Sequence, residues 1–551
     1  MLPEESASMT SAVPRLQTAE AFGLDPFGEH VAHGMRDLFR PLEDLLISGG
    51  DPRLALDPAT GLNEYGCGPQ PASDDFSFAS STASVISERA FERVARARED
   101  MMRSAIALGL EEAFDARFEA MREELKAQLG LSHDIDVVFA PSGTDAQLLA
   151  LFVAQVRLGR RLTTILVGSD QTGSGAAYTA RGRHFNMLTA AGCAVRKDEP
   201  VAGLGCEAVA VPLTDLQGEV RGAAEIDAAV LDAVARATAG GAAGLLQVMD
   251  SSKLGWRAPG EDCLAEIARR WPDKVQIVVD ACQMRLGRGR MKAYLDRGYM
   301  VLITGSKYFG GPAFAGALLL PPALSRPFHK KSMKLAPGLA DYTGRSDWPK
   351  AYKALRGRLE SRANLGQWLR WEAALAEMSA YYAVPAAFRS RAVRELGQGI
   401  EDLITLSPQL KAVPRLPLTV AADDEDFAHP TIFPFTVHGP HGAIGAEKCR
   451  ALYRALSRDM SRLIQTSAAD AEIAARCCLV GQPVRLERAG AKPIAALRVC
   501  IGARLITDAW TGEPAAARRN LEHTLDRIAT IVAKIELLLV AAGAEFAGGL
   551  T

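Results

Sequence analysis

Short apolar runs alternate with helical stretches through the middle of the chain. The runs are "DVVFA", "TTILVG", "GLLQVMD", "VQIVVD", "MVLIT" and "AGALLLP", and all of them lie between residues 136 and 321. Helical sequence separates several of these runs, as in "DAQLLALFVAQVRLG" (145–159) and "CLAEIARRWP" (263–272). Strands that are apolar without polar alternation are typical of a parallel sheet covered by helices on both faces. The pattern therefore predicts an α/β fold with a mostly parallel sheet.

The flanking sequence differs from this pattern and divides the chain into three parts. Residues 1–100 mix helical pieces with Gly-, Pro-, Asn- and Asp-rich sequence, which is typical of an ordered arm or extension. We expect the alternating region to form a large domain over residues 101–345. Residues 346–551 contain a long helical stretch, candidate strands at "TIFPFTVHG" and "AALRVCIGA", and a terminal helix. This mixture predicts a smaller C-terminal α+β domain.

The composition excludes several classes of protein. Among 551 residues, 63 Lys and Arg nearly balance 65 Asp and Glu, so the net charge of −2 indicates no nucleic-acid partner. The nine Cys follow no disulfide or metal-ligand spacing, which suits a reducing compartment. The start of the chain, "MLPEESASMTSAVP", lacks the apolar segment of a secretory signal, and charges at Lys534 and Glu536 interrupt the most apolar C-terminal stretch. We expect a cytoplasmic protein with no membrane span, and a Gly-Pro turn, not a metal site, at His438 and His441.

Polar residues follow three of the predicted strands. Ser142, Gly143 and Thr144 stand between "DVVFA" and the next helix, where free backbone amides and hydroxyls form an anion site suited to phosphate. Asp280 ends "VQIVVD", and Lys307 follows the next strand, "MVLIT". Taken singly, these residues also fit a helix N-cap, a partnered carboxylate and a surface lysine. Ligands of open parallel sheets bind beyond the carboxyl ends of the strands, so we expect these residues to meet there.

One cofactor, pyridoxal 5′-phosphate, requires an anion cradle, an acid and a lysine together. Asp280 would keep the pyridine nitrogen protonated, so that the ring can accept the electrons of a broken α-carbon bond. Lys307 would form the Schiff base with the cofactor and then move protons as general base and acid. The combination predicts that Lys307 and Asp280 are catalytic and that the small-molecule substrate is an amino acid.

The motifs around these residues resemble those of fold-type I pyridoxal-phosphate enzymes, specifically the class V aminotransferase and cysteine desulfurase-like family. The resemblance covers residues 135–320 and is weaker to residue 507. "PSGTDA" resembles the family's phosphate-binding turn, and "DACQ" resembles the motif whose Gln, here Gln283, bonds the phenolic oxygen of the cofactor. "TGSK" resembles the segment of the Schiff-base lysine, which implies a phosphate contact for Thr304. The resemblance also implies a fold-type I fold and a homodimer, in which "SRANLG" (361–366) reaches the partner's phosphate.

Two residues depart from the family's pattern at positions that contact the cofactor. Ser306 stands where the family has a His before the lysine. Gln171, in "SDQTGSG", stands where the family has a His that stacks on the cofactor ring. We expect both residues to contact the cofactor, although Gln cannot stack as an aromatic ring does. Ser251 and Ser252, at the end of another strand, either line the ring or form a turn.

The C-terminal sequence "CLVGQPVRLERAGAKPIAALRVCIGARL" resembles the desulfurase region that carries a sulfur-accepting Cys and a substrate-binding Arg. The Arg position matches Arg498, which implies a clamp on the substrate carboxylate; a structural salt bridge is the alternative for a lone cation in an apolar strand. The Cys position matches Val480, whereas Cys478 and Cys449 lie elsewhere. A persulfide needs a mobile, exposed thiolate, so desulfurase activity is disfavoured.

The sequence favours aminotransferase-type chemistry and leaves two alternatives open. A lyase of the C–S or β-elimination type would use the same lysine and acid without the desulfurase cysteine. The missing family histidines also suit a catalytically silent scaffold, although the intact Lys307, Asp280 and Gln283 argue against one. A cofactor-sensing regulator would need a DNA-binding module, and residues 1–100 contain no basic recognition helix.

Overall fold

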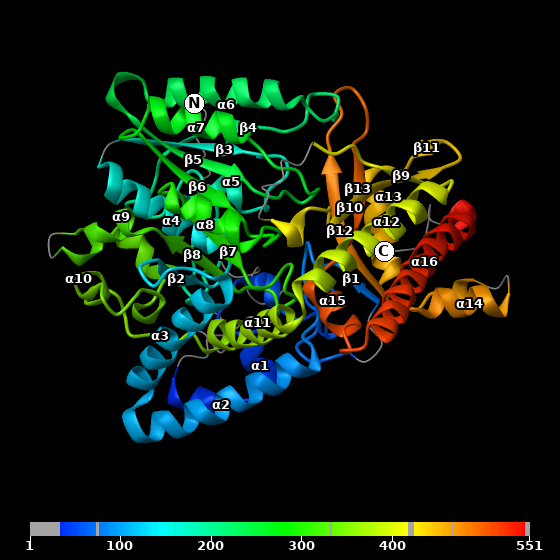
Figure 1. The fold of residues 1–551 in the computed structure, drawn as a ribbon, viewed down its shortest axis with the longest axis horizontal. Helices are drawn as coiled ribbons and strands as arrows, with labels where there is room; N and C mark the ends of the chain where they lie inside the picture. Colours follow the sequence, from blue (N-terminus) through cyan, green and yellow to red (C-terminus); the bar gives the residue numbers. More distant parts are fainter. Residues whose placement is uncertain are drawn as a thin grey trace, which may run out of the picture.

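The computed structural model describes residues 34–72, 76–159, 161–330, 333–416, 424–464 and 467–545. The sequence "MLPEESASMTSAVP", which is expected to carry no secretory signal, lies outside these residues. In the described part, two β-sheets lie side by side with helices around them, the larger sheet on the left and the smaller on the right in Figure 1. Every helix among the described residues is too short or too polar to span a membrane.

The larger sheet has seven strands in the order β2-β8-β7-β6-β5-β3-β4. Its strands are β2 (Asp136–Ala140), β3 (Leu162–Val167), β4 (Glu207–Val211), β5 (Ala243–Met249), β6 (Val275–Asp280), β7 (Met300–Thr304) and β8 (Gly316–Leu320). All of its neighbours pair in parallel except β8, which runs antiparallel to β2 and β7. The predicted fold class, an α/β architecture with a mostly parallel sheet, is confirmed.

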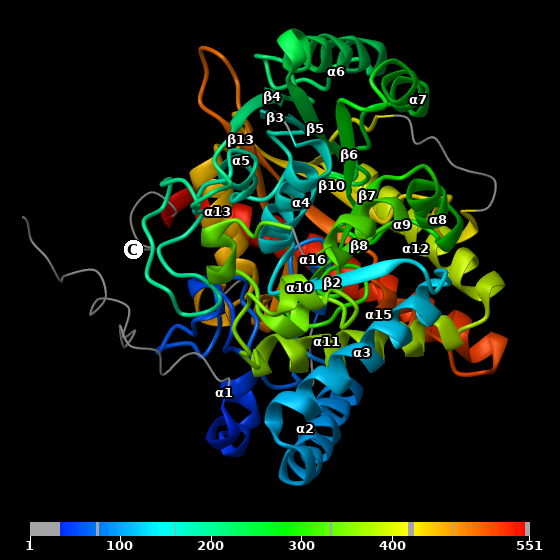
Figure 2. The same cartoon turned by 90° about the vertical axis from the view of Figure 1, so that its left-hand side faces the viewer.

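Both faces of this sheet are buried, as the continuous apolar runs predict. Successive strand residues point to opposite faces, so Val279 and Val301 join one apolar cluster and Val278 and Leu302 join another. The helices nearest the sheet are α4 (Gly143–Leu158), α6 (Ala223–Ala237), α7 (Glu261–Arg270) and α8 (Arg288–Asp296). Helix α4 covers the second face, and α6, α7 and α8 contribute to the first (Figure 2). Helix α4 is buried along most of its length because its residues are apolar on nearly all sides.

The smaller sheet has six strands and includes one from the N-terminal part of the chain. Its strands are β1 (Phe76–Phe78), β9 (Leu410–Ala412), β10 (Ile432–Gly439), β11 (Gly442–Ala443), β12 (Cys478–Leu486) and β13 (Ile494–Cys500). Strand β1 pairs in parallel with β12, and the other pairs are antiparallel. The helices beside it are α12 (Ala386–Leu406), α13 (Ala446–Leu456), α14 (Ala468–Ala475), α15 (Ala503–Ala509) and α16 (Pro514–Glu545). The predicted strands at "TIFPFTVHG" and "AALRVCIGA" correspond to β10 and β13.

Three long helices form a layer beneath both sheets in Figure 1, where α2 and α11 run side by side. The helices outside the two sheet regions are α1 (Leu42–Leu46), α2 (Glu88–Leu108), α3 (Leu110–Leu129), α5 (Ala176–Thr179), α9 (Pro322–Ser325), α10 (Lys353–Arg356) and α11 (Leu365–Ala383). Helices α2, α3 and α11 are joined by ion pairs from Arg93 and Arg117 to the buried Glu372. Helices α2 and α3 of this layer connect the described residues before α2, here called the N-terminal segment, to strand β2 of the larger sheet.

The N-terminal segment packs against the loop that follows Lys307. Leu54 and Val85 of this segment share an apolar cluster with Phe314 and with Leu479 of β12. The segment thus lies where the two sheets approach each other. Its position places several of its side chains next to the predicted site.

Candidate active site

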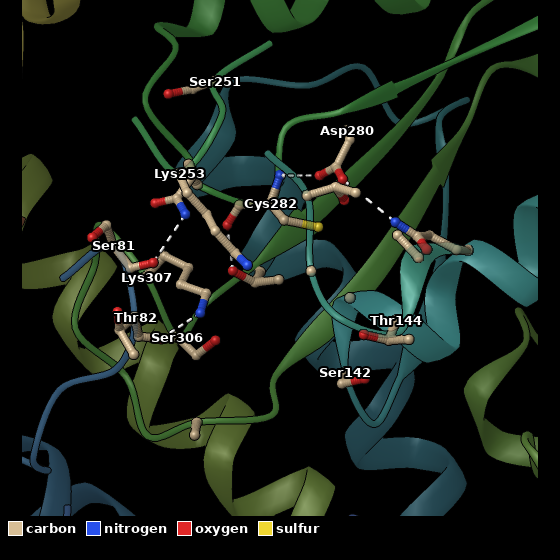
Figure 3. A pocket seen from close by; sticks show the side chains of 18 of the residues that line it. Ser81, Thr82, Ser142, Thr144, Ser251, Lys253, Asp280, Cys282, Ser306 and Lys307 are labelled. Atoms are coloured by element: carbon tan, nitrogen blue, oxygen red, sulfur yellow. Dashed lines mark hydrogen bonds between the residues drawn. The ribbon is translucent and has the colours of Figure 1, made fainter. Parts of the chain in front are cut away.

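One pocket collects residues from the carboxyl ends of β5, β6 and β7 and from the start of α4 (Figure 3). Nine predicted residues line it: Ser142, Gly143, Thr144, Gln171, Asp280, Gln283, Thr304, Ser306 and Lys307. The parallel strands bring these residues together because their carboxyl ends meet at one edge of the sheet. The candidate site therefore lies where the sequence places it.

The start of α4 forms one wall of the pocket and presents donors to it. Ser142 is the N-cap, and its hydroxyl oxygen accepts a hydrogen bond from the Asp145 amide at 3.2 Å. Among the described residues, the amides of Gly143 and Thr144 have no hydrogen-bond partner. A Cβ at Gly143 would come within 2.8 Å of Cys282 Sγ and 3.2 Å of Thr304 Cγ2, so a larger residue here would force these side chains to shift. Free amides at a helix N-terminus bind anions, and the phosphate of the predicted cofactor fits this position.

An acid beneath this wall carries less negative charge than an ordinary carboxylate. Burial raises the pKa of Asp145 to about 7, even though its carboxylate accepts a hydrogen bond from the Ser142 hydroxyl. Proton uptake by Asp145 therefore limits its repulsion of an anion bound at the start of α4. Thr304 closes the wall by donating from its hydroxyl to the Cys282 carbonyl oxygen at 2.6 Å.

Asp280 reaches the pocket from the end of β6. It accepts hydrogen bonds from the Cys282 amide at 3.1 Å and from Gln147 Nε2 at 3.5 Å. Burial of its carboxylate raises the pKa of Asp280, and no Lys or Arg of the described chain lies within ion-pair distance of it. A half-buried carboxylate of this kind is stabilised by a cationic partner, and a protonated pyridine nitrogen would supply one.

Lys307 enters the pocket from the loop after β7 and faces an uncharged acceptor. Its ammonium donates a hydrogen bond to the backbone carbonyl of Thr82. Burial, together with the positive charges of Arg498 and Lys253, lowers the pKa of Lys307 to about 7. A lysine with this pKa is substantially neutral near pH 7 and can attack an aldehyde.

Two glutamine oxygens near these groups are buried without a hydrogen-bond donor in the described structure. They are Oε1 of Gln171 and Oε1 of Gln283. The Gln283 side chain is held by its Nε2, which donates to the Ser81 carbonyl at 3.0 Å. Buried acceptors usually find a donor, so both oxygens are available to a bound ligand.

Arg498 lies behind the pocket wall and does not line it. Its Nη1 donates to the Lys253 carbonyl at 3.1 Å, and its Nη2 donates to the Thr82 hydroxyl at 3.2 Å and to the Gln482 carbonyl at 2.5 Å. The Nε atom is buried without a partner in the described structure. Arg498 therefore approaches the pocket through the two residues, Thr82 and Lys253, that form its wall.

Several pocket residues could not be predicted from the sequence, because no local sequence pattern marks them. Four come from the N-terminal segment: Arg53, Tyr65, Ser81 and Thr82. Their sequence is turn-rich, and only the tertiary fold brings it to the strand ends. Lys253 also lines the pocket, directly after the two serines at the end of β5. Of those serines, Ser251 lines the pocket, whereas the Ser252 hydroxyl accepts from the amides of Leu254 and Trp256 and so forms a turn.

Of the cysteines near the C-terminus, Cys449, Cys478 and Cys500 are buried, whereas Cys477 is exposed but does not line the pocket. Cys478 and Val480 lie in β12, and burial raises the pKa of Cys449 in α13 to about 12. Cys282 lines the pocket, but burial raises its pKa well above the ordinary value. These environments disfavour a thiolate, which sulfur transfer through a persulfide requires.

No family model matches the chain, and no curated protein matches it by sequence. Solved structures similar to it include the cystine C-S lyase C-DES in complex with cysteine persulfide, at 14% identity over 83% of this chain and 98% of that chain, with a TM-score of 0.48. They also include the cysteine desulfurase CsdA from Escherichia coli, at 14% identity over 82% and 95%, with a TM-score of 0.45. A phosphoserine aminotransferase SerC from Cytophaga hutchinsonii is similar at 13% identity over 82% and 98%, with a TM-score of 0.46. At this level of similarity the three reactions are not distinguished.

Proposed function

We propose that the protein is a pyridoxal-phosphate-dependent enzyme that transforms an amino acid, with aminotransferase-type chemistry as the first candidate. The observation that carries the proposal is the convergence of Lys307, Asp280 and the start of α4 on one pocket. An anion site at a helix start, a half-buried acid without a cationic partner and a lysine with a lowered pKa are separate features. Their combination matches the three ends of this cofactor.

The residues present fit the cofactor at each of its polar groups. The amides of Gly143 and Thr144 would donate to the phosphate, and the Ser142 and Thr304 hydroxyls would do so after releasing their present acceptors, the Asp145 carboxylate and the Cys282 carbonyl. Asp280 would hold the proton of the ring nitrogen, and Gln283 would bond the phenolic oxygen. Gln171 and Ser306 would contact the ring and the phosphate side of the pocket in place of the two family histidines. Pyridoxal phosphate, when bound, serves as an electron sink for the bonds of the substrate α-carbon.

Lys307 would perform two tasks in the reaction. Its lowered pKa leaves the amine neutral near pH 7, so it can bond covalently to the cofactor aldehyde. When it is not bonded to the cofactor, the Lys307 amine would take or deliver a proton at the substrate α-carbon. Arg498 would orient the substrate through its carboxylate, either directly after a shift of Thr82 or through that residue.

A lyase of the C–S or β-elimination type remains the second candidate, because it would use the same Lys307 and Asp280. A silent scaffold is disfavoured because Lys307, Asp280 and Gln283 line one pocket together with the start of α4. We also propose a cytoplasmic homodimer, since residues 361–366 resemble the segment that reaches a partner's phosphate. Elution of the cofactor-loaded protein at monomer mass in light-scattering chromatography would contradict the dimer.

An amino-acid panel separates the two enzyme candidates. The cofactor-loaded protein is incubated with each amino acid, and the products are identified by mass spectrometry. A 2-oxo acid together with pyridoxamine phosphate supports transamination. Ammonia, sulfide or an eliminated fragment supports a lyase, and the absence of turnover with every amino acid contradicts both.

A further inference from the structure

Lys253 is a second pocket lysine that the proposed chemistry does not use. It follows β5 in the loop that carries Ser251, and its side chain lines the same pocket as Lys307. Figure 3 shows Lys253 and Lys307 on one side of the pocket and Ser142 and Thr144 on the other. Lys253 therefore lies on the Lys307 side of the pocket, away from the residues expected to bind the phosphate.

The backbone of Lys253 is fixed at both ends of the residue. Its amide donates to the Gln171 carbonyl at 3.3 Å, and its carbonyl accepts from Arg498 Nη1 at 3.1 Å. These bonds tie the residue to a predicted cofactor contact and to the predicted carboxylate clamp. The position of its side chain is thus coupled to both groups.

Among the described lysines and arginines that line the pocket, Lys253 is the one whose charged group has neither a hydrogen-bond nor an ion-pair partner. By contrast, Arg53 is paired with Asp51, with its Nε 2.9 Å from Oδ1, and Lys307 donates to the Thr82 carbonyl. Burial and the positive charges of Arg498 and Arg53 lower the pKa of Lys253 to about 8, so the surroundings carry excess positive charge.

The cofactor and an ordinary amino acid would leave this charge unbalanced. The phosphate is assigned to the start of α4, the ring nitrogen to Asp280 and the substrate α-carboxylate to Arg498. A half-buried cation that lines a pocket without a partner is costly, and a second anion would reduce that cost. An acidic side chain on the substrate would supply that anion.

We propose that Lys253 binds an anionic group on the substrate side chain, so that the enzyme prefers acidic amino acids over their neutral analogues. The inference rests on the proposed function, since it concerns the substrate of the same site. Its distinguishing feature is selectivity between two amino acids that differ only in side-chain charge.

The test measures selectivity on matched pairs of amino acids. Cofactor-loaded protein is titrated with L-aspartate and L-asparagine, and with L-glutamate and L-glutamine. Binding is followed by the visible absorbance of the cofactor and, independently, by calorimetry. We expect at least one acid to bind about tenfold or more tightly than its amide, because a charge-assisted hydrogen bond is lost in the amide.

Substitution of Lys253 assigns this selectivity to the residue. Lys253→Met should bring the acid-to-amide ratio close to one, and Lys253→Gln should do the same if the methionine variant folds poorly. Lys448→Met, which changes an exposed lysine on α13, should keep the wild-type ratio. A ratio unchanged in Lys253→Met and Lys253→Gln would overturn the inference, as would a wild-type ratio near one.

Two further outcomes separate this inference from the proposed function. If Lys253→Met weakens acids and amides equally, Lys253 serves the α-carboxylate and the side-chain assignment is wrong, while the proposed function stands. If no amino acid changes the cofactor absorbance or gives a calorimetric signal, the proposed function itself fails and the inference fails with it.

Discussion

The Lys307 ammonium donates a hydrogen bond to the backbone carbonyl of Thr82, which lies 225 residues earlier in the chain. The hydroxyl of the same Thr82 accepts from Arg498 Nη2 at 3.2 Å. One residue of the N-terminal segment therefore joins the predicted nucleophile to the predicted substrate clamp. Because its carbonyl is uncharged, it orients Lys307 without holding the lysine in its protonated form.

The first prediction concerns the pH at which Lys307 becomes reactive. Capture of pyridoxal phosphate by the cofactor-free protein should accelerate as the pH rises through about 7, because the lowered pKa makes the amine neutral above that pH. An ordinary lysine would remain charged up to a pH of about 10.4. The rate is measured by stopped-flow absorbance, with N-acetyl-lysine methyl ester as a reference amine titrated under the same conditions.

The pH dependence of the capture rate shows whether the pKa of Lys307 is lowered. The protein rate should level off about one pH unit above the pKa of Lys307, while the reference amine continues to accelerate. A protein rate that instead follows the reference amine would show that Lys307 is an ordinary, solvated lysine.

The second prediction concerns Asp280, the proposed partner of the ring nitrogen. Asp280→Asn cannot keep a proton on the ring nitrogen, so turnover should fall by about 10²–10³-fold, as expected for loss of one preorganised electrostatic group. Steady-state kinetics on the best substrate of the panel gives this value. Asp273→Asn, which changes a carboxylate with an 81% exposed side chain, is the matched control and should keep wild-type turnover. Full activity in Asp280→Asn would mean that this carboxylate is structural.

The third prediction concerns Arg498, which is buried and donates to three acceptors. Arg498→Lys keeps the positive charge but loses the planar fork, so it should raise KM by about tenfold while the cofactor absorbance is retained. Arg498→Ala should raise KM further. Arg485→Lys on the neighbouring strand β12 has a 59% exposed side chain and should leave KM unchanged.

Thermal unfolding shows whether Arg498 acts on the substrate or on the fold. A lowered Tm in Arg498→Lys with an unchanged KM would assign the residue a structural role. In that case the hydrogen bonds to Thr82, Gln482 and Lys253 are its whole function, and the substrate carboxylate is held by another group.

The sequence predicts the large sheet well because its strands are apolar on both faces. Strand β4 is the exception: its residues "EAVAV" are partly exposed, so it lacks the continuous buried pattern of the six predicted strands. It lies at the edge of the sheet and pairs with β3 alone. An edge strand covered on fewer sides has a weaker apolar signal.

The predicted site residues share one property, which is that they stand within a few residues of a strand end. Ser142, Asp280, Gln283 and Lys307 could be located in this way because sequence pattern identifies the strands. Thr82 could not, since its contact with Lys307 arises from the packing of the N-terminal segment against β12 and the loop after Lys307. Contacts of this kind depend on tertiary structure and leave no local pattern.

Reductive trapping shows most directly whether Lys307 bonds the cofactor. The pocket contains two lysines, Lys253 and Lys307, and this method identifies which of them is bonded. The purified protein is loaded with pyridoxal phosphate and reduced with borohydride, and the labelled peptide is identified by mass spectrometry. We expect the label on Lys307, with Lys307→Ala unlabelled and Lys253→Met labelled as in the wild type. A label on Lys253 or on any other lysine, or no bound cofactor at all, would contradict it.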